Sequence, residues 1–232
     1  GSNAFVKYIQ ENTRIPVLGH SEGVCHGYID KLADLDKSIR ICLDSKLQYP
    51  AACNAMETLL VHKDIAEKVL PDLVGIFKEK QVELVGCVKT CQVVPEVTLA
   101  HESDWDMEYN DLKLSIKIVD SFSEAVKFIN RHGSGHTDVI ITENLERAEQ
   151  FLNEVSSSSV MWNASTRFAD GFRYGLGAEI GISTNRTHAR GPVGLEGLII
   201  YKYKLYGNGQ VAGDYSGANA REFTHKPLTP SM

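Results

Sequence analysis

Short apolar runs alternate with helical patterns over most of this chain, and no other feature constrains its fold as strongly. The apolar runs, rich in Val, Ile and Leu, lie at residues 57–62, 82–85, 114–119, 139–141 and 160–162. Between several of them, apolar residues recur every three or four positions, as they do on one face of an α-helix. Strands that alternate with helices typically build a parallel sheet covered by those helices. The sequence therefore predicts an α/β fold with a mostly parallel sheet flanked by helices.

One cysteine lies among small residues directly after a predicted helix. Pro50 disfavours helical backbone at the residue before it, so the helix predicted over residues 32–47 must end there. The residues at positions 51, 52 and 55 are alanines, whose small side chains leave space around Cys53. A substrate carbonyl and backbone N–H groups could therefore both reach its sulfur. Free cysteine is also among the most buried residue types, so a packed structural cysteine is the alternative.

Charge and cysteine content exclude several classes of function. A net charge of −6 offers no basic field for general binding to nucleic acid or to an anionic membrane surface. The sequence contains no apolar run close to the roughly 20 residues that span a bilayer, and we expect a soluble, cytoplasmic protein. Its five cysteines form an odd set without a CxxC pair, which argues against a disulfide framework and against structural zinc. The sequence predicts no metal site.

Polar side chains follow the predicted strand at residues 160–162. In a parallel sheet, ligands commonly bind at the turns that follow strands. An arginine is suited to holding a carboxylate or phosphate through two parallel hydrogen bonds. The alternative for Arg167 is a structural ion pair with Glu179 or Asp170. The polar residues of this loop are Asn163, Ser165, Thr166 and Arg167.

Four blocks carry a resemblance to a known family. Residues 49–62 read YPAACNAMETLLVH, with VLGH at 17–20 before them and NASTRFADG at 163–171 and HARGPVGLEG at 188–197 after them. Together the blocks resemble gamma-glutamyl phosphate reductase, also called glutamate-5-semialdehyde dehydrogenase, of the aldehyde dehydrogenase superfamily. The resemblance runs from about residue 5 to residue 206, and residues 207–226 look most like the stand-alone fungal form.

The resemblance implies an NADPH-dependent reduction of L-glutamyl 5-phosphate to L-glutamate 5-semialdehyde in proline biosynthesis. Cys53 would be the catalytic nucleophile that forms a thioester with the substrate. Val17 stands where the superfamily commonly has a glutamate base, and its apolar side chain disfavours attack of water on that thioester. Glu108 would contact the nicotinamide ribose of the cofactor, although a merely solvated carboxylate is the alternative. The residues implied in substrate binding are Asn54, Asn163, Ser165, Thr166 and Arg167.

The resemblance also implies a domain organisation. Residues 1–4 look like the remnant of an expression tag, and residues 5–197 correspond to an aldehyde-dehydrogenase-like catalytic domain. Most of the NADPH site would belong to upstream polypeptide, so we expect the chain alone to be inactive. Residues 198–206 alternate as a late strand that would join a homo-oligomer, and the rest of 198–232 is a surface tail. A glutamate 5-kinase is an expected functional partner, as a separate protein or fused to the parent chain.

Two readings from other classes of protein remain open at this point. A thiol-dependent hydrolase would need a base such as His62 or His136 hydrogen-bonded to Cys53. A non-catalytic oligomerisation module would use Cys53 only for packing. The position of the sulfur relative to solvent and to the imidazoles distinguishes these readings.

Overall fold

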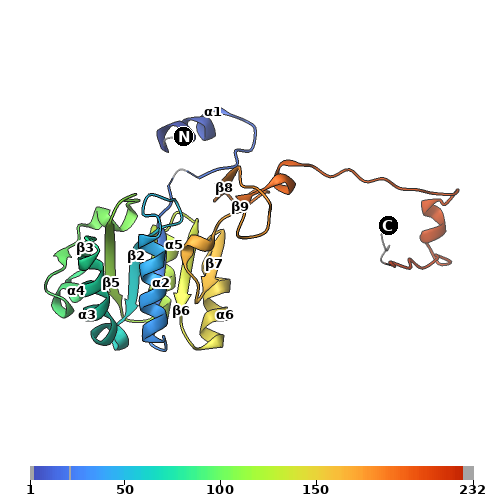
Figure 1. The fold of residues 1–232 in the computed structure, drawn as a ribbon. Helices are drawn as coiled ribbons and strands as arrows, with labels where there is room; N and C mark the ends of the chain where they lie inside the picture. The colour runs from blue at the N-terminus through green and yellow to red at the C-terminus, as the bar shows by residue number, and fades with distance from the viewer. Residues whose placement is uncertain (1–2, 21, 227–232) are drawn as a thin grey trace. The chain divides into compact units, whose positions relative to one another are not determined.

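The computed structural model of the chain describes residues 3–20 and 22–226, and a seven-stranded sheet forms its centre. The strands pair in the order β4-β3-β5-β2-β1-β6-β7, and every pairing is parallel (Figure 1). Residues 1–2 of the predicted tag remnant and 227–232 of the predicted tail lie outside the described residues. The strands are β1 (Cys25–Ile29), β2 (Met56–His62), β3 (Glu83–Gly86), β4 (Thr98–Leu99), β5 (Lys113–Val119), β6 (Thr137–Ile141) and β7 (Ser159–Trp162).

Helices cover both faces of this sheet, and each face has its own cluster of buried side chains. One cluster joins the sheet to α2 (Leu35–Leu47), α3 (Lys63–Glu79) and α4 (Val88–Val93). The other joins it to α5 (Phe122–His132) and α6 (Leu145–Glu154) (Figure 1). The α/β fold with a parallel sheet between helices is therefore confirmed.

The sequence pattern explains why these segments form these elements. Every residue of β1 and of β2 is buried, as expected for central strands of a parallel sheet that is covered on both faces. The helix α2 begins after Asp34, whose side chain accepts a hydrogen bond from the backbone N–H of Lys37 at 2.8 Å. It ends at Leu47, three residues before Pro50, as the sequence predicts.

A small second sheet lies beyond the main one. Its strands β8 (Gly181–Ser183) and β9 (Gly191–Val193) are antiparallel. Residues 17–20 are tied to the end of β8 by two hydrogen bonds. The side chain of Asn185 donates to the Val17 carbonyl at 2.6 Å, and the backbone N–H of Thr184 donates to the Gly19 carbonyl at 3.3 Å. This sheet therefore fixes the segment that leads into β1.

Residues 200–232 form a separate compact unit from residues 1–199, and residues 200–226 contain little regular structure. The short 3₁₀ helix η4 (Ala212–Tyr215) lies in this unit, where Tyr215 stacks on Phe223 with ring centroids 4.8 Å apart. The strand expected at 198–206 does not form in the single chain, and its pairing with a partner subunit stays a prediction. The 3₁₀ helix η3 (Leu195–Leu198) ends at residue 198, and residues 199–206 pair with no other described strand. A strand needs a hydrogen-bonded neighbour, and Tyr203 is 99% exposed here.

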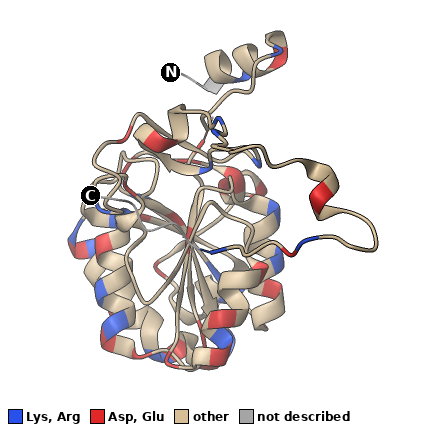
Figure 2. Cartoon of the chain, turned by 90° about the vertical axis from the view of Figure 1, so that its right-hand side faces the viewer, with Lys and Arg blue, Asp and Glu red and all other residues tan. Residues whose placement is uncertain are grey.

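Charged residues of both signs are interspersed over the helices that cover the sheet (Figure 2). None of the described helices combines the length and the apolar character needed to cross a membrane.

Candidate functional site

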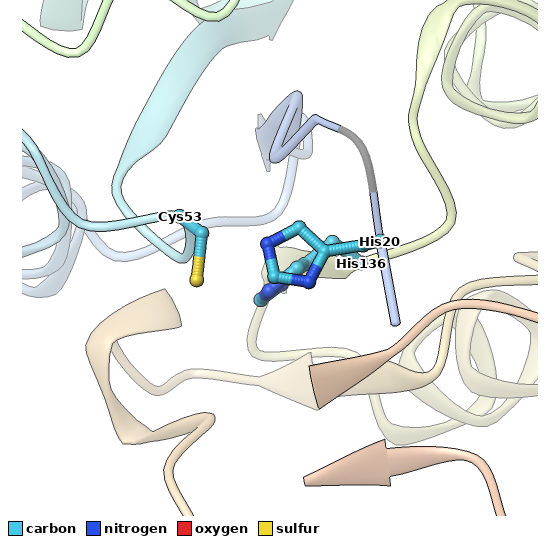
Figure 3. Close-up of side chains that lie close together, drawn as sticks. All are labelled: His20, Cys53 and His136. Carbon is cyan, nitrogen blue, oxygen red and sulfur yellow. The ribbon is translucent and has the colours of Figure 1, made fainter. Parts of the chain in front are cut away.

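Three segments bring His20, Cys53 and His136 together at one edge of the sheet. His20 lies before β1, Cys53 lies in the turn before β2, and His136 directly precedes β6. These three strands are neighbours and parallel, so the segments that enter them meet at the amino-terminal edge. One donor atom from each side chain lies within 4.8 Å of the other two, and Figure 3 shows the three side chains converging.

The backbone of Cys53 is held closely by its neighbours. A β-carbon at Gly23 would lie 2.1 Å from the Cys53 carbonyl oxygen, so glycine is required at that position. The buried thiol of Cys25 donates to the same carbonyl at 3.3 Å. The side chain of Asn54 is buried and donates to the Ala169 carbonyl at 2.8 Å. The turn is thus fixed, while the sulfur of Cys53 belongs to a half-buried side chain that solvent reaches.

Burial and nearby carboxylates keep the Cys53 thiol protonated. Partial burial raises its pKa to about 11, and the charges of Glu108 and Glu179 add to the rise. The charge of Arg167 lowers the pKa, as does the backbone N–H of Cys53 itself. Without substrate, the thiol therefore needs a base before it can act as a nucleophile near neutral pH.

The imidazoles of His20 and His136 lie beside that thiol. His136 is fully buried, and burial together with the charge of His20 lowers its pKa to about 3. The two rings meet edge to face with centroids 4.9 Å apart. No described hydrogen bond joins either imidazole to the sulfur of Cys53. His62 is different, because its Nδ1 accepts from the Asp64 backbone N–H at 3.2 Å and caps α3 at the far end of β2.

Arg167 lies near enough to Cys53 for its charge to lower the pKa of that thiol. Its side chain is half-buried, its Nε donates to Gln48 Oε1 at 2.8 Å, and its guanidinium lies 5.8 Å from the centroid of the Tyr49 ring. Burial lowers the pKa of Arg167, and the charge of Cys53 raises it. Within the described residues Arg167 forms no ion pair with Asp170 or Glu179. The structural alternative for this arginine is therefore not supported.

The other polar residues of that loop divide between two places. Ser165 and Thr166 are buried beside Ser45 of α2, whose hydroxyl donates to Ser165 Oγ and accepts from the Thr166 backbone N–H, both at 3.2 Å. Asn163 instead forms hydrogen bonds with the loop after β6, where its Nδ2 donates to Glu143 Oε1 at 3.1 Å. Glu143 also accepts from Lys37 in the first turn of α2, whereas Arg167 contacts Gln48 after its last turn. The loop runs along α2, so Asn163 is not brought to Cys53.

A buried ion pair lies beneath the turn that holds Cys53. Lys46 Nζ is 2.6 Å from Glu57 Oε2, and both side chains are almost completely buried. Burial raises the pKa of Glu57 to about 7 even though Lys46 opposes the rise. The other oxygen of Glu57 accepts from the Asn110 backbone N–H at 3.3 Å. The pair thus anchors the loop that carries the half-buried Glu108 near the sulfur.

Known proteins were compared with the chain on sequence and on structure, and no family model matches it. Two curated gamma-glutamyl phosphate reductases are closely similar. That of Trichormus variabilis is 57% identical over 226 residues, and that of Acetivibrio thermocellus is 58% identical over 228 residues. These matches cover 97% and 98% of the chain.

In sequence, the chain belongs to the gamma-glutamyl phosphate reductase family. It spans about half the length of these relatives, 52% in both cases. The crystal structure of the reductase from Thermotoga maritima superposes with a TM-score of 0.88 at 44% identity, over 91% of this chain and 51% of that one. An acetylating aldehyde dehydrogenase from Geobacillus thermoglucosidasius superposes at 0.60 with 18% identity, which shows a shared fold alone.

The comparisons do not favour the fungal subgroup that residues 207–226 suggest. The reductase of Saccharomyces cerevisiae is 38% identical over 93% of this chain, with a TM-score of 0.50. That identity is lower than the 57–58% found for the two bacterial reductases.

Sequence reasoning missed one feature of this reductase-like site. The sequence predicts His136 as a possible base and carries His20 in the block at residues 17–20, but it does not predict that both lie beside Cys53. Spacing carries no such signal, since the three residues precede three different strands. The order of strands in the sheet is what brings them together.

Proposed function

We propose that this chain supplies the catalytic part of a gamma-glutamyl phosphate reductase, which converts L-glutamyl 5-phosphate into L-glutamate 5-semialdehyde in proline biosynthesis. The single observation that supports this most is the half-buried thiol of Cys53, which is set on a fixed turn beside the imidazoles of His20 and His136 and feels the charge of Arg167. The identity to named reductases supports the same reaction.

In the first step, the sulfur of Cys53 attacks the γ-carbonyl carbon, the bond from that carbon to the phosphate oxygen breaks, and a thioester forms. The thiol proton must leave as the sulfur attacks, because the pKa of Cys53 is raised to about 11 by burial. The nearest bases are His20 and His136, whose nitrogens lie within 4.8 Å of the sulfur. Inorganic phosphate is the leaving group, and it takes the electron pair of the broken bond.

Substrate groups meet complementary partners around the sulfur. The backbone N–H of Cys53 lies close enough to its own sulfur to lower the pKa, and it is a candidate donor to the developing oxyanion. Asn54 Oδ1 is a buried acceptor without a partner among the described residues, so it fits an N–H of the substrate. Arg167 fits the carboxylate or the phosphate of the substrate. Ser165 and Thr166 set the position of Arg167, and we assign Asn163 only to shaping the start of the loop.

The cofactor proposed for the second step is NADPH, which supplies hydride to the acyl carbon when bound. Glu108 fits one contact with it, because its half-buried carboxylate couples electrostatically to Cys53 and could accept from ribose hydroxyl groups. The rest of the cofactor site would come from polypeptide beyond this chain, so we expect no turnover from the chain alone. Val17 offers no base near the site, which protects the thioester from water.

We also propose that the reductase works as a homo-oligomer in the cytoplasm. The apolar side chains of residues 199–206 are exposed in the single chain, with Ile200 at 95%, and a partner subunit would give this segment the strand pairing that it lacks here. Association with a glutamate 5-kinase would supply the unstable acyl phosphate directly.

The test combines the chain with the remaining part of the reductase and measures phosphate-dependent formation of NADPH from glutamate semialdehyde and NADP⁺. Cys53→Ala should abolish this activity, whereas Cys87→Ser should retain it. Retention of activity by Cys53→Ala would exclude the mechanism. Slow release of free glutamate from the acyl phosphate without any NADPH chemistry would instead favour a thiol hydrolase that uses His136.

A further inference from the structure

We propose that His20, Cys53 and His136 form a zinc-binding site. The metal would be coordinated by the same Cys53 sulfur that acyl transfer needs. Zinc is a borderline-soft cation that thiolate and imidazole ligands select, and sites with three protein ligands leave a fourth position to solvent. The spacing of residues along the chain predicts no metal site, so the proposal rests on the three-dimensional cluster alone.

The three side chains are close enough together to hold one metal ion. Donor atoms of the three side chains lie within 4.8 Å of one another. Zinc bonds of about 2.0–2.3 Å in a tetrahedral arrangement put ligand atoms roughly 3.3–3.6 Å apart. The cluster must therefore contract by about 1 Å, a movement within reach of the half-buried side chains of Cys53 and His20 by small side-chain rotations.

The hydrogen bonding of His20 leaves one ring nitrogen available to a metal. Its Nδ1 lies 2.8 Å from the Ile182 carbonyl oxygen, and a carbonyl can only accept. The ring must therefore carry its proton on Nδ1, which leaves the lone pair of Nε2 available. Histidines that bind metals almost always donate their other ring N–H in this way to a carbonyl or carboxylate.

His136 has a ring nitrogen without a partner among the described residues. The side chain is fully buried, and its Nε2 has no hydrogen-bond partner among the described residues. Its Nδ1 lies 2.8 Å from Thr137 Oγ1 and 3.8 Å from Cys25 Sγ. Because the Cys25 thiol gives its proton to the Cys53 carbonyl, both neighbours of Nδ1 can accept a proton from it. A buried polar atom without a partner is unusual, and a metal ion at Nε2 would satisfy it.

The consequence for activity rests on the proposed function, whereas metal binding itself does not. Coordination requires the thiolate and displaces the thiol proton. The bound sulfur then shares one of its electron pairs with the metal, which lowers its nucleophilicity and blocks the approach of an acyl phosphate. Zinc should therefore inhibit the reductase, and a chelator should restore its activity.

The test titrates the 232-residue chain with Co²⁺ as a spectroscopic substitute for zinc, and then displaces it with Zn²⁺. We expect one equivalent of Co²⁺ to give a thiolate-to-metal charge-transfer band together with intense visible bands of a tetrahedral site. His20→Ala and Cys53→Ala should each weaken binding at least about tenfold and remove the corresponding spectral features. His136→Gln should do the same, with circular dichroism used to check that the buried substitution still folds.

The matched control is the double variant Cys87→Ser with Cys91→Ser. It removes two cysteines that lie close together in the sequence and outside the proposed site, so it should leave the spectrum unchanged. The proposal is overturned if Co²⁺ does not bind, if binding depends on Cys87 and Cys91, or if His20→Ala and Cys53→Ala bind as wild type does. These spectra require no turnover, so a normal cobalt spectrum of the chain together with an inactive assembled reductase would contradict the proposed function and leave the metal site standing.

Discussion

Gly23 lies directly against the carbonyl group of Cys53, where a β-carbon would come within 2.1 Å of the oxygen and 2.8 Å of the carbonyl carbon. Both contacts are with backbone, which cannot swing aside as a flexible side chain can. The segment before β1 and the turn before β2 therefore pack closely against each other at Gly23. The position of the Cys53 sulfur depends on this contact.

Gly23→Ala should move the turn and lower activity more than it lowers stability. We expect a destabilisation of about 1–3 kcal/mol from overpacking and at least a tenfold loss of kcat/KM in the assembled reductase, since displacing a nucleophile by about 1 Å can cost a hundredfold. Urea unfolding and steady-state kinetics measure the two effects.

Gly75→Ala is the control for that experiment, because a β-carbon at this position inside α3 meets nothing within 4 Å. Its expected effect is a stabilisation of about 0.5–1 kcal/mol with unchanged activity. Wild-type activity in Gly23→Ala would show that the close contact does not position the sulfur.

Alkylation by iodoacetamide should reach Cys87 before Cys53 in the isolated chain. Burial raises the pKa of Cys53 to about 11, so its labelling rate should climb about tenfold per pH unit up to that value. Burial also acts on Cys87, but hydrogen bonds from Thr90 prevail and lower the pKa of Cys87 below its ordinary value. Peptide mapping at pH 7 against time checks the order, and earlier labelling of Cys53 would show that its thiolate is stabilised by a group that this account lacks.

Glu108→Gln should accelerate the labelling of Cys53. The negative charge of Glu108 opposes the thiolate, so its removal lowers the pKa of Cys53 and raises the thiolate fraction at any pH below it. We expect roughly a two- to tenfold faster reaction at pH 8, with the rate of Cys87 unchanged as the internal control. An unchanged Cys53 rate would place Glu108 too far from the sulfur to contact the same ligands.

Arg167→Gln should have the opposite effect on the same measurement. Loss of its positive charge raises the pKa of Cys53 and slows alkylation below pH 11. In the assembled reductase, the variant should also raise KM for the semialdehyde by about 10- to 100-fold, because charge-assisted hydrogen bonds to the substrate are lost. Arg173→Gln is the matched control. Equal kinetics for the two variants would remove Arg167 from the substrate site.

Breaking the Lys46–Glu57 pair should be costly, whereas replacing it should not. Lys46→Met leaves a buried carboxylate without its partner, and we expect a loss of about 3–5 kcal/mol in the free energy of unfolding. The double variant Lys46→Met with Glu57→Leu should recover most of that loss. A double variant as unstable as the single one would show that Glu57 contributes mainly through its bond to the Asn110 backbone.

The sheet could be predicted from the sequence because its strands are continuous apolar runs with helical patterns between them. Cys53 can be named as the candidate nucleophile from its small neighbours and from the sequence block around it. Asn163 and Arg167 lie at opposite ends of α2 for a physical reason. Four residues of extended chain can cover up to about 14 Å, so a loop named as one motif reaches from the first turn of α2 to its end.

Two other features depend on partners that sequence patterns do not show. The convergence of His20 and His136 on Cys53 follows from the order of β2, β1 and β6 in the sheet, which alternation alone does not fix. The alternation at 198–206 indicated a strand, but backbone pairing needs a neighbour, and the described chain supplies none to these residues.

The most direct test of the central claim is mass spectrometry of the chain after exposure to L-glutamyl 5-phosphate generated in place from glutamate and ATP by a separate kinase. The account predicts a single glutamyl adduct that hydroxylamine removes, mapped to Cys53, absent from Cys53→Ala and present in Cys87→Ser. An adduct on another residue, or equal labelling of Cys53→Ala, would contradict it.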